Sequence, residues 1–417
     1  MIIDSTALPE QAVASVIESA FQSAGQRCSA LRVLYVQEDI YDKFITMLKG
    51  AMDLLDCDDP WQLSTDVGPL IDNEAHESIG AYIKSKTSDI LHQTQITAKE
   101  GHFIPPTLIK VDGIADLDHE IFGPVLHLAK YSAGGFFKVI EDINASGYGL
   151  TFGLHTRVDE RVQDAVTAIE AGNIYINRNQ IGAIVESQPF GGKKLSGTGP
   201  KAGGPHYLLR FLKESNASVV TTDVKPSGSQ TDSFTLETST TGEPLVPHTK
   251  LLLDTLPEQL QFCSEEITNA LQLAEAHFHT TIDLPGPTGE SNRLSMEPVG
   301  TVLCLNAGND SHWLAQIVQS LALGNAVIMA GSDAKKYAAI IEAWLQEHKP
   351  ATLQATDAEA ESPAIADLLA SAQLDAVAIA NRVQLIKAVR KILAERDGPI
   401  ISIACLLYTS PSPRDRG

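Results

Sequence analysis

Apolar residues near the start of the chain recur with two different periods. From Leu8 to Ala24 they follow the spacing of a helix, which Gly25 ends. The run from Arg32 to Gln37 is β-branched and apolar, which predicts a buried strand. The segment from Gly25 to Ala30 then lies in a connection between a helix and a strand, where a rigid scaffold can present a reactive side chain.

The alternation of helix and strand patterns continues to about residue 220. Helical patterns cover Asp39–Leu55, Ile71–Lys86 and Glu160–Glu170, and strand patterns cover Leu108–Val111, Val125–Tyr131 and Asn173–Asn177. This mixture predicts an α/β layered domain, which we place at residues 1–222. The segment Thr221–Gly242 is rich in Ser, Thr, Gly and Asp and has little apolar periodicity. It predicts a linker, taken as residues 223–250.

A second folded region is predicted at residues 251–404. Its strand patterns lie at Val299–Leu305, Asn325–Ala330, Leu374–Ile379 and Pro399–Ala404, and its helical patterns at Leu251–Phe278, Trp313–Leu323, Lys335–Glu347 and Val383–Glu395. A βαβαβ succession predicts a doubly wound, Rossmann-like parallel sheet. The last residues, 405–417, break the pattern. Cys405–Asp415 matches a translated transposase sequencing adapter, so we expect an artefact there rather than an ordinary Pro- and Ser-rich tail.

Composition and charge exclude several classes of function. The 417 residues carry 31 Lys and Arg against 52 Asp and Glu, a formal net charge of −21. Such an acidic chain repels phosphate backbones and anionic lipids at long range, so neither is an expected partner. No apolar run is long enough to span a bilayer, and the N-terminus lacks the features of a secretory signal. We therefore expect a cytoplasmic protein without a transmembrane segment.

The five cysteines are scattered and include no Cys-x-x-Cys pair, so neither a disulfide framework nor a bound metal is predicted. One of them, Cys28, lies beside Arg27 in the glycine-flanked connection. A thiol near a cation and free backbone amides ionises more readily than a core cysteine, and the thiolate is the nucleophile. Position and neighbours alone leave two interpretations open for Cys28, a nucleophile and a structural cysteine.

Two further segments could form parts of a site. In Glu120–Val125 the pair Gly123-Pro124 predicts a sharp bend that can hold Glu120 and Phe122 toward a cleft. In Pro189–Gly199 the backbone can approach a ligand closely, because glycine leaves its amide uncovered. By itself the first segment is weak evidence, and the second is equally compatible with a flexible surface loop.

Together and in this order, the three segments resemble the motifs of the aldehyde dehydrogenase superfamily. GQRCSA at residues 25–30 resembles its nucleophile segment, EIFGPV at 120–125 its cofactor-ribose segment, and PFGGKKLSGTG at 189–199 its active-site loop. The resemblance covers Met1 to about Thr222 and implies the three-layer α/β catalytic domain of that family. Ser196–Tyr207 and Gly286–Glu290 also look like the branch that oxidises glutamate semialdehyde, in particular the carboxy-terminal portion of its bifunctional proline-catabolic enzymes.

The resemblance implies a role for each matching residue. Cys28 would attack the aldehyde of L-glutamate γ-semialdehyde (1-pyrroline-5-carboxylate) to form a thiohemiacetal. A hydride would pass to NAD, and water would hydrolyse the thioester to L-glutamate, in the second step of proline catabolism. The backbone amide of Cys28 would stabilise the oxyanion. Glu120 would hold the nicotinamide ribose, with Phe122 packed nearby.

The resemblance also implies a site for the substrate α-carboxylate. Ser29, Gly203 and Gly204 would bind it, and Phe211 would pack against the aliphatic part of the substrate. A hydroxyl and exposed backbone amides are good carboxylate donors that add no charge. Arg27 would assist as a cation, or it is a solvated or structurally paired arginine.

The second region resembles the superfamily's cofactor domain in a degraded form. Glu297–Val302 and Leu323–Val327 look like its first strands, but Ala330–Asp333 stands where the family has Lys-Pro-Ser-Glu. The lysine of that family motif contacts the cofactor ribose, so we predict no dinucleotide binding in this region. A structural cover or an assembly domain is the expected role, because a fold does not fix a function.

Several parts that the family places before the nucleophile have no counterpart among the 27 residues that precede Cys28. These are the cofactor-binding domain, the oxyanion asparagine and the general-base glutamate of a Glu-x-Gly-Gly segment. We therefore expect a truncated, inactive chain, with an FAD-dependent proline dehydrogenase domain further upstream in the complete protein. Two alternatives stay open: a dehydrogenase for another carboxylated aldehyde, and a non-catalytic scaffold that binds a complete partner. Superfamily members assemble through strand exchange, so we expect a homo-oligomer with Ala217–Thr222 as an interface strand.

Overall fold

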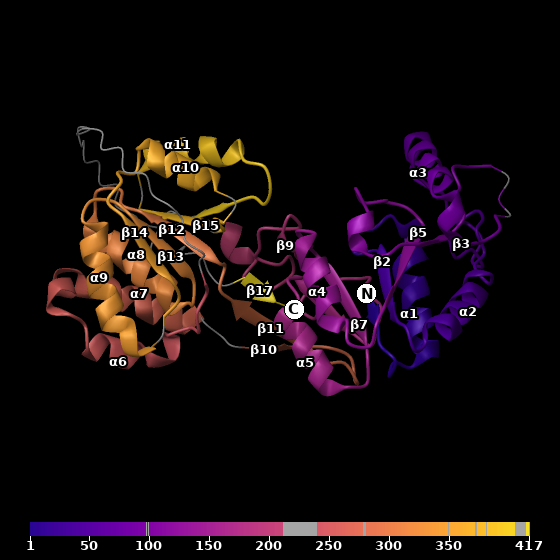
Figure 1. Ribbon diagram of the computed structural model, residues 1–417, viewed down its shortest axis with the longest axis horizontal. Helices are drawn as coiled ribbons and strands as arrows, with labels where there is room; N and C mark the ends of the chain where they lie inside the picture. The colour runs from indigo at the N-terminus through magenta and orange to yellow at the C-terminus, as the bar shows by residue number, and fades with distance from the viewer. Residues whose placement is uncertain are drawn as a thin grey trace. The chain divides into compact units, whose positions relative to one another are not determined.

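The computed structural model describes residues 1–96, 98, 100–211, 240–277, 281–348, 350–371, 373–380, 382–404 and 414–416. These residues form two compact units (Figure 1), and each is treated by itself. The first unit comprises Met1–Ile184 with Phe190–Ser196, and the second comprises Val185–Pro189 with Gly197–Gly417. The predicted interface strand Ala217–Thr222 and most of the predicted linker lie outside the described residues. The interface strand and the boundaries of the linker therefore remain predictions.

The first unit is built on a seven-stranded sheet. Its strands follow the order β3-β4-β5-β2-β1-β7-β8, and all neighbours are parallel except β3 and β4. The strands are β1 (Ile2–Ile3), β2 (Val33–Gln37), β3 (Ile90–Gln93), β4 (Thr107–Lys110), β5 (Val125–Tyr131), β7 (Thr151–His155) and β8 (Asn173–Ile176). The helices are α1 (Pro9–Phe21), α2 (Tyr41–Met52), α3 (Asn73–Ser85), α4 (Phe136–Ala145) and α5 (Asp159–Ala168). A separate antiparallel ribbon pairs β6 (Tyr148–Gly149) with β9 (Lys193–Lys194).

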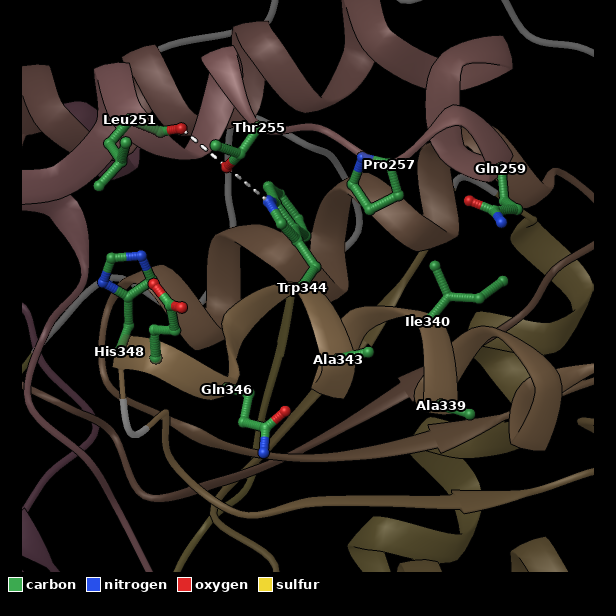
Figure 2. Close-up of a pocket in the computed structure, with 11 residues that line it drawn as sticks. Leu251, Thr255, Pro257, Gln259, Ala339, Ile340, Ala343, Trp344, Gln346 and His348 are labelled. Carbon is green, nitrogen blue, oxygen red and sulfur yellow. Dashed lines mark hydrogen bonds between the residues drawn. The ribbon is translucent and has the colours of Figure 1, made fainter.

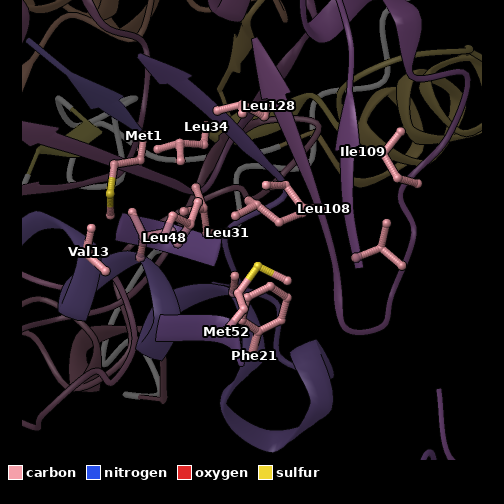
Figure 3. Close-up of a cluster of buried hydrophobic side chains, with 14 of the residues drawn as sticks. Met1, Val13, Phe21, Leu31, Leu34, Leu48, Met52, Leu108, Ile109 and Leu128 are labelled. Carbon is pink, nitrogen blue, oxygen red and sulfur yellow. The ribbon is translucent and has the colours of Figure 1, made fainter. Parts of the chain in front are cut away.

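Helices cover both faces of this sheet, which gives it three layers. On β2, Leu34 and Val36 pack in one buried cluster with α1, α2 and α3, whereas Val33 and Tyr35 pack in another with α4 and α5. The division follows from the alternation of side chains along a strand. Figure 3 shows part of the first cluster, where side chains of α1 and α2 meet those of β2 and β4.

The second unit is built on a five-stranded parallel sheet of order β14-β13-β12-β15-β16. The strands are β12 (Thr301–Leu305), β13 (Ala326–Ala330), β14 (Leu353–Thr356), β15 (Ala376–Ile379) and β16 (Ser402–Ala404). The helices are α6 (Thr249–Asp254), α7 (Ser264–His277), α8 (Asp310–Ala322), α9 (Ala334–Leu345), α10 (Pro363–Ala370) and α11 (Val383–Ala394). Helices α6 to α9 pack on one face, and α10 and α11 pack on the other (Figure 1). This strand order is the doubly wound order of a Rossmann-like fold.

The remaining elements are short. A small antiparallel sheet joins β10 (Ile282–Leu284), β11 (Asn292–Glu297) and β17 (Arg414–Arg416). Single 3₁₀ segments lie at Gln22–Gly25, Thr87–Asp89, Ile114–Asp116, Leu208–Phe211, Val246–His248, Glu258–Cys263 and Gln346–His348. Residues 405–413 of the predicted adapter lie outside the described residues. No helix in the described ranges combines the length and apolar character needed to cross a membrane.

The predicted α/β class is confirmed in both units, with two corrections. The single helix predicted over Leu251–Phe278 is wrong, because α6 ends at Asp254 and α7 begins at Ser264. Pro257 lies between them and has no amide hydrogen with which to continue a helix. The first helix ends at Phe21 and passes into a 3₁₀ turn that reaches Gly25, since Ser23 and Ala24 have φ values of 56° and 54°.

Candidate active site

Cys28 lies at the surface of the first unit, on a turn between α1 and β2. Within the turn, the amide of Ala30 donates to the carbonyl of Arg27 at 3.0 Å. From outside, Nε2 of Gln180 donates to the carbonyl of Ser29 at 3.1 Å. The scaffold therefore presents an exposed thiol on a turn that is fixed on both sides of the sulfur.

The other described cysteines differ from Cys28 in burial. Cys57, Cys263 and Cys304 are all buried, whereas Cys28 is exposed. Burial raises the pKa of Cys57 and Cys263 to about 11 and that of Cys304 to about 12. These three thiols stay protonated at pH 7, and a protonated thiol is a poor nucleophile. Cys28 is thus the candidate nucleophile among the cysteines in the described part of the chain.

Gly25 brings the Cys28 turn into contact with the second motif. Its φ is +65°, and a Cβ atom at this position would lie 2.2 Å from the carbonyl oxygen of Gly123. Only glycine combines this backbone conformation with so close an approach. The segments GQRCSA and EIFGPV, distant in the sequence, therefore meet backbone to backbone.

Arg32 joins the same two segments through its guanidinium group. Its Nε donates to Glu120 Oε1 at 2.9 Å, and its Nη2 lies 2.9 Å from the same oxygen. Its Nη1 donates to the carbonyl of Gly25 at 2.7 Å, and Nη2 donates to that of Arg27 at 3.1 Å. The guanidinium carbon lies 4.8 Å from the centre of the Phe122 ring, which is a cation–π contact.

Arg32 is the site residue that the sequence pattern does not identify, because the pattern places it at the head of a buried strand. The available signal is a charged residue that opens an otherwise apolar run. Its side chain is only 14% exposed, so its charge requires a partner, and Glu120 is that partner. Burial lowers the pKa of Arg32, and the charges of Glu120 and Cys28 oppose that shift.

Glu120 and Phe122 remain accessible on the outer side of Arg32. The Glu120 side chain is 52% exposed, and Phe122 is 45% exposed. Arg32 holds Oε1 of Glu120, and among the described residues no hydrogen bond is found to Oε2. An ionised carboxylate with an uncommitted oxygen can accept hydrogen bonds from hydroxyl groups.

A buried histidine supports the backbone of Arg32. Nδ1 of His127 lies 2.9 Å from the Arg32 carbonyl oxygen, and Nε2 lies 2.8 Å from the hydroxyl of Tyr82. Burial lowers the pKa of His127 to about 4, so the ring is neutral at pH 7. A neutral ring that donates from Nδ1 and accepts at Nε2 satisfies both contacts. His127 therefore anchors Arg32 rather than transferring protons at neutral pH.

The part of the third motif that belongs to the first unit, Phe190–Ser196, is tied to its surroundings. The strand β9 within it pairs with β6. The hydroxyl of Ser196 accepts from the amide of Gly149 at 3.0 Å, and Lys194 forms an ion pair with Glu170. These contacts give this stretch a defined conformation, although glycine-rich segments are often flexible.

The residues predicted to bind the substrate carboxylate are divided between the units. Ser29 belongs to the first unit and is buried next to Cys28, whereas Gly203, Gly204 and Phe211 belong to the second unit. The structure thus brings Cys28 and Ser29 together with Glu120 and Phe122 in one unit.

Within the second unit, the Gly203-Gly204 segment is a tight turn. Gly203 has a φ of +75°, and its carbonyl accepts from the amide of Glu186 at 3.0 Å. The amide of Gly204 donates to the carbonyl of Lys201 at 3.2 Å. Phe211 is 70% exposed and packs edge-on against Tyr207, with ring centres 5.4 Å apart.

The carboxyl end of β12 is where a doubly wound sheet binds its ligand. Here side chains already accept from the nearby amides. Oδ1 of Asn306 accepts from Gly308 at 2.8 Å, and Oδ1 of Asn309 accepts from His312 at 3.0 Å. Asp310, the first residue of α8, accepts from the Asn306 side chain at 2.7 Å. A carboxylate at this helix start opposes a phosphate. That no dinucleotide binds in this unit stays a prediction.

A groove of about 660 Å³ lies between α6 and α9 in the second unit. Figure 2 shows the Trp344 ring within it, with Nε1 donating to Thr255 Oγ1 at 3.2 Å. The Thr255 hydroxyl in turn donates to the carbonyl of Leu251 at 2.8 Å. None of the predicted site residues lines this groove.

Among the described residues, no group of three or more His, Cys, Asp or Glu side chains is placed to hold a metal ion.

The sequence is similar to one known protein family and to several named proteins. The family model described as the aldehyde dehydrogenase family matches residues 1–216. The bifunctional protein PutA of Klebsiella aerogenes is 39% identical over 417 residues, which is 97% of this chain and 30% of the relative. The 1-pyrroline-5-carboxylate dehydrogenase 1 of Halalkalibacterium halodurans is 36% identical over 227 residues, which is 52% of this chain and 43% of the relative.

A solved structure of bifunctional proline utilization A (PutA) is also similar to part of the chain. It matches 50% of this chain and 22% of its own length, with 47% sequence identity and a TM-score of 0.49. The chain spans 30% of the length of the PutA relative from Klebsiella aerogenes.

Proposed function

Because the chain belongs to the aldehyde dehydrogenase family, we propose that Cys28 is the nucleophile with which the whole protein carries out an NAD-dependent oxidation of L-glutamate γ-semialdehyde to L-glutamate. Similarity to proteins named PutA and 1-pyrroline-5-carboxylate dehydrogenase supports this substrate, and with it a step of proline catabolism. The observation that carries the proposal is the exposed thiol on a turn that Arg32 ties to the Glu120 carboxylate.

The thiolate form of a cysteine is the nucleophile. Sγ of Cys28 attacks the aldehyde carbon, so that a C–S bond forms and the carbonyl oxygen becomes an oxyanion. The backbone amide of Cys28 donates to that oxyanion. Departure of a hydride from the same carbon leaves a thioester. Water then adds to the thioester, releases L-glutamate and returns the thiol.

NAD, when bound, supplies the acceptor for that hydride. Glu120 would hold it by the ribose hydroxyls, since one carboxylate oxygen is fixed by Arg32 and the other has no hydrogen bond among the described residues. Phe122 is half exposed beside Glu120 and would pack nearby. These two residues fit a ribose in both chemistry and accessibility.

The α-carboxylate of the substrate would be bound by Ser29, Gly203 and Gly204. The proximity of Ser29 to the nucleophile supports its assignment. Phe211 is exposed and offers an apolar face to the aliphatic part of the substrate. The amide of Gly204 already donates to Lys201 at 3.2 Å, so its role requires sharing of that long hydrogen bond.

The proposal can be tested without NAD, because acylation of Cys28 requires only its thiolate and an activated ester, and the carboxylate site affects the rate. The probes are p-nitrophenyl monoesters of glutarate, succinate and adipate, with the uncharged valerate ester for comparison. The thiolate attacks the ester carbonyl, the C–O bond breaks, and p-nitrophenolate leaves. We expect the glutarate ester, whose acyl group has the substrate's length and distal carboxylate, to acylate Cys28 about tenfold faster than valerate, since a charge-assisted hydrogen bond contributes about 1.5 kcal/mol.

The acylated residue is identified by peptide mass spectrometry, and Cys28→Ser is the control that must abolish the adduct. Fastest reaction with succinate or adipate would replace the proposed substrate by another carboxylated aldehyde. Equal rates for valerate and glutarate would contradict the carboxylate site. Failure of every ester to acylate Cys28 in the folded chain would contradict the nucleophile and favour a non-catalytic scaffold.

A further inference from the structure

One planar guanidinium group spans both motif segments of the site. Nη1 and Nη2 of Arg32 donate to the carbonyl oxygens of Gly25 and Arg27, and Nε and Nη2 contact Glu120 Oε1. All three nitrogens are engaged, so rotation of the group toward one partner weakens its contact with another. A rigid fork of this kind transmits a displacement at one end to the other.

The contact with Arg27 bears directly on the nucleophile. The carbonyl of Arg27 and the amide of Cys28 belong to the same peptide group. Because that group is planar, a donor that fixes the carbonyl also fixes the direction of the Cys28 N–H. This N–H is the proposed oxyanion donor, so Nη2 of Arg32 determines where that donor points.

Charge links the same residues. The Arg32 side chain is largely buried, and Glu120 compensates its charge at 2.9 Å. The charges of Glu120 and Cys28 both act on the guanidinium. In a partly shielded site, removal of the Glu120 charge leaves Arg32 less compensated and strengthens its attraction for a nearby thiolate.

We propose that Arg32 is a positioning residue that couples the Glu120 carboxylate to the Cys28 nucleophile, so that a change at Glu120 alters the reactivity of the thiol. The inference rests on the proposed function for the roles of the two coupled residues. Arg32 itself touches neither substrate nor cofactor in this proposal. A group that engages Glu120, such as a ribose, would thereby influence the nucleophile before any bond to the aldehyde forms.

The test is a double-mutant cycle on the full chain, with the rate of Cys28 alkylation by iodoacetamide at pH 7 as the readout. Peptide mass spectrometry reports Cys28 separately from the other cysteines. Loss of one nearby compensating charge changes such a rate by about three- to tenfold. We expect Arg32→Met to slow alkylation by about that factor and Glu120→Gln to accelerate it by about threefold. In the Arg32→Met background, Glu120→Gln should have no effect.

Two controls separate coupling from a general loss of charge or structure. Arg27→Met removes an exposed arginine that contacts Ser23 instead of Glu120, so the effect of Glu120→Gln should persist in that background. Glu170→Gln removes the acidic partner of Lys194, which is not among the contacts found for Arg32, and should leave the Cys28 rate unchanged. An unchanged rate in Glu120→Gln, or an equal change with and without Arg32, would overturn the proposal.

Arg32→Lys covers the case in which Arg32→Met does not fold. Lysine retains the charge but has no planar fork, so it cannot hold Glu120 and two carbonyls together. We expect Arg32→Lys to reduce the effect of Glu120→Gln to less than about half and to increase amide hydrogen exchange in residues 26–30. If Arg32→Lys keeps both the full effect of Glu120→Gln and the parental hydrogen-exchange protection of residues 26–30, the proposed role of the planar guanidinium group is contradicted.

Failure of this proposal is distinguishable from failure of the proposed function. Iodoacetamide carries no carboxylate and the cycle uses no aldehyde or NAD, so coupling is measured whatever the natural substrate is. The ester series instead measures carboxylate recognition with Arg32 intact. If the double-mutant cycle shows no coupling but the glutarate ester still reacts fastest, only the coupling by Arg32 is contradicted. If the cycle shows coupling but the glutarate ester is not preferred, only the proposed substrate is contradicted.

Discussion

Gly25 and Arg32 hold the Cys28 turn by different means. Gly25 permits an approach of two backbones that a side chain would prevent, because its missing Cβ would lie 2.2 Å from the Gly123 oxygen. Arg32 then occupies the adjoining space and satisfies carbonyl groups on both sides. The first contact sets the distance between the segments and the second sets their orientation, so a substitution at either position acts on the nucleophile without touching it.

Replacing Gly25 with alanine should therefore destabilise the fold and disturb the thiol together. The left-handed backbone is unfavourable for alanine by about 1 kcal/mol, and relief of a clash with a backbone oxygen requires movement of the main chain, so we expect a loss of about 2–4 kcal/mol in the free energy of unfolding. Urea unfolding measures the loss, and iodoacetamide alkylation reports Cys28.

Gly50→Ala is the matched control for this substitution. Gly50 lies in α2, and a Cβ atom there would have no neighbour within 4 Å. Alanine favours a helix over glycine by about 1 kcal/mol, so this variant should be as stable as the parent or more so. Equal stabilities of the two variants would show that the close approach at Gly25 does not constrain the turn.

At the level of helices and strands, the sequence predicted best those elements whose apolar residues form long runs. β5 coincides with the predicted Val125–Tyr131, because a parallel strand buried on both faces is an almost continuous apolar run. The sequence does not predict β1, because a strand of two residues is too short to show an alternating pattern. Its place in the sheet depends on pairing with β2 and β7, which are distant in the sequence.

The same limit applies to the candidate site. The sequence predicts Cys28 and Glu120 as site residues because each lies in a recognisable local motif. It does not predict Arg32, since the function of that residue depends on contacts with Glu120 and the Cys28 turn that only the folded chain creates. The hydrophobic pattern of the sequence alone assigns Arg32 to the strand that it precedes. The helix predicted across Pro257 failed for a local reason, because its apolar period continued through a residue that cannot sustain it.

The start of α8 provides a test of an individual element in the second unit. Asn309 caps this helix by accepting from the amide of His312 at 3.0 Å, and α8 is buried from Trp313 to Ala322. Asn309→Ala should lower the free energy of unfolding by about 1 kcal/mol, because it leaves an amide without its acceptor. Asn309→Asp keeps an acceptor and should retain most of the stability. Urea unfolding compares the two, and equal losses would exclude capping as the cause.

Across the whole chain, two kinds of titratable group respond to acid in opposite directions. The formal net charge is −21, so protonation of surface carboxylates relieves repulsion within a strongly acidic chain. Buried histidines act against this effect. Burial lowers the pKa of both His127 and His155 to about 4, so each ring is held neutral inside the first unit.

These two histidines should make the first unit less stable below neutral pH. An unfolded histidine has a pKa of about 6.5, so the unfolded chain binds more protons than the folded chain between pH 6.5 and 4. Stability therefore falls as pH falls through this window, by about 2–3 kcal/mol for each histidine.

His127→Gln should lower the free energy of unfolding at pH 7, because it disturbs the contacts with Arg32 and Tyr82. It should nevertheless weaken the pH dependence of stability between pH 7 and 4.5. Urea unfolding at the two pH values measures the difference. A parental slope in His127→Gln would mean that carboxylates, and not this buried ring, govern the response to acid.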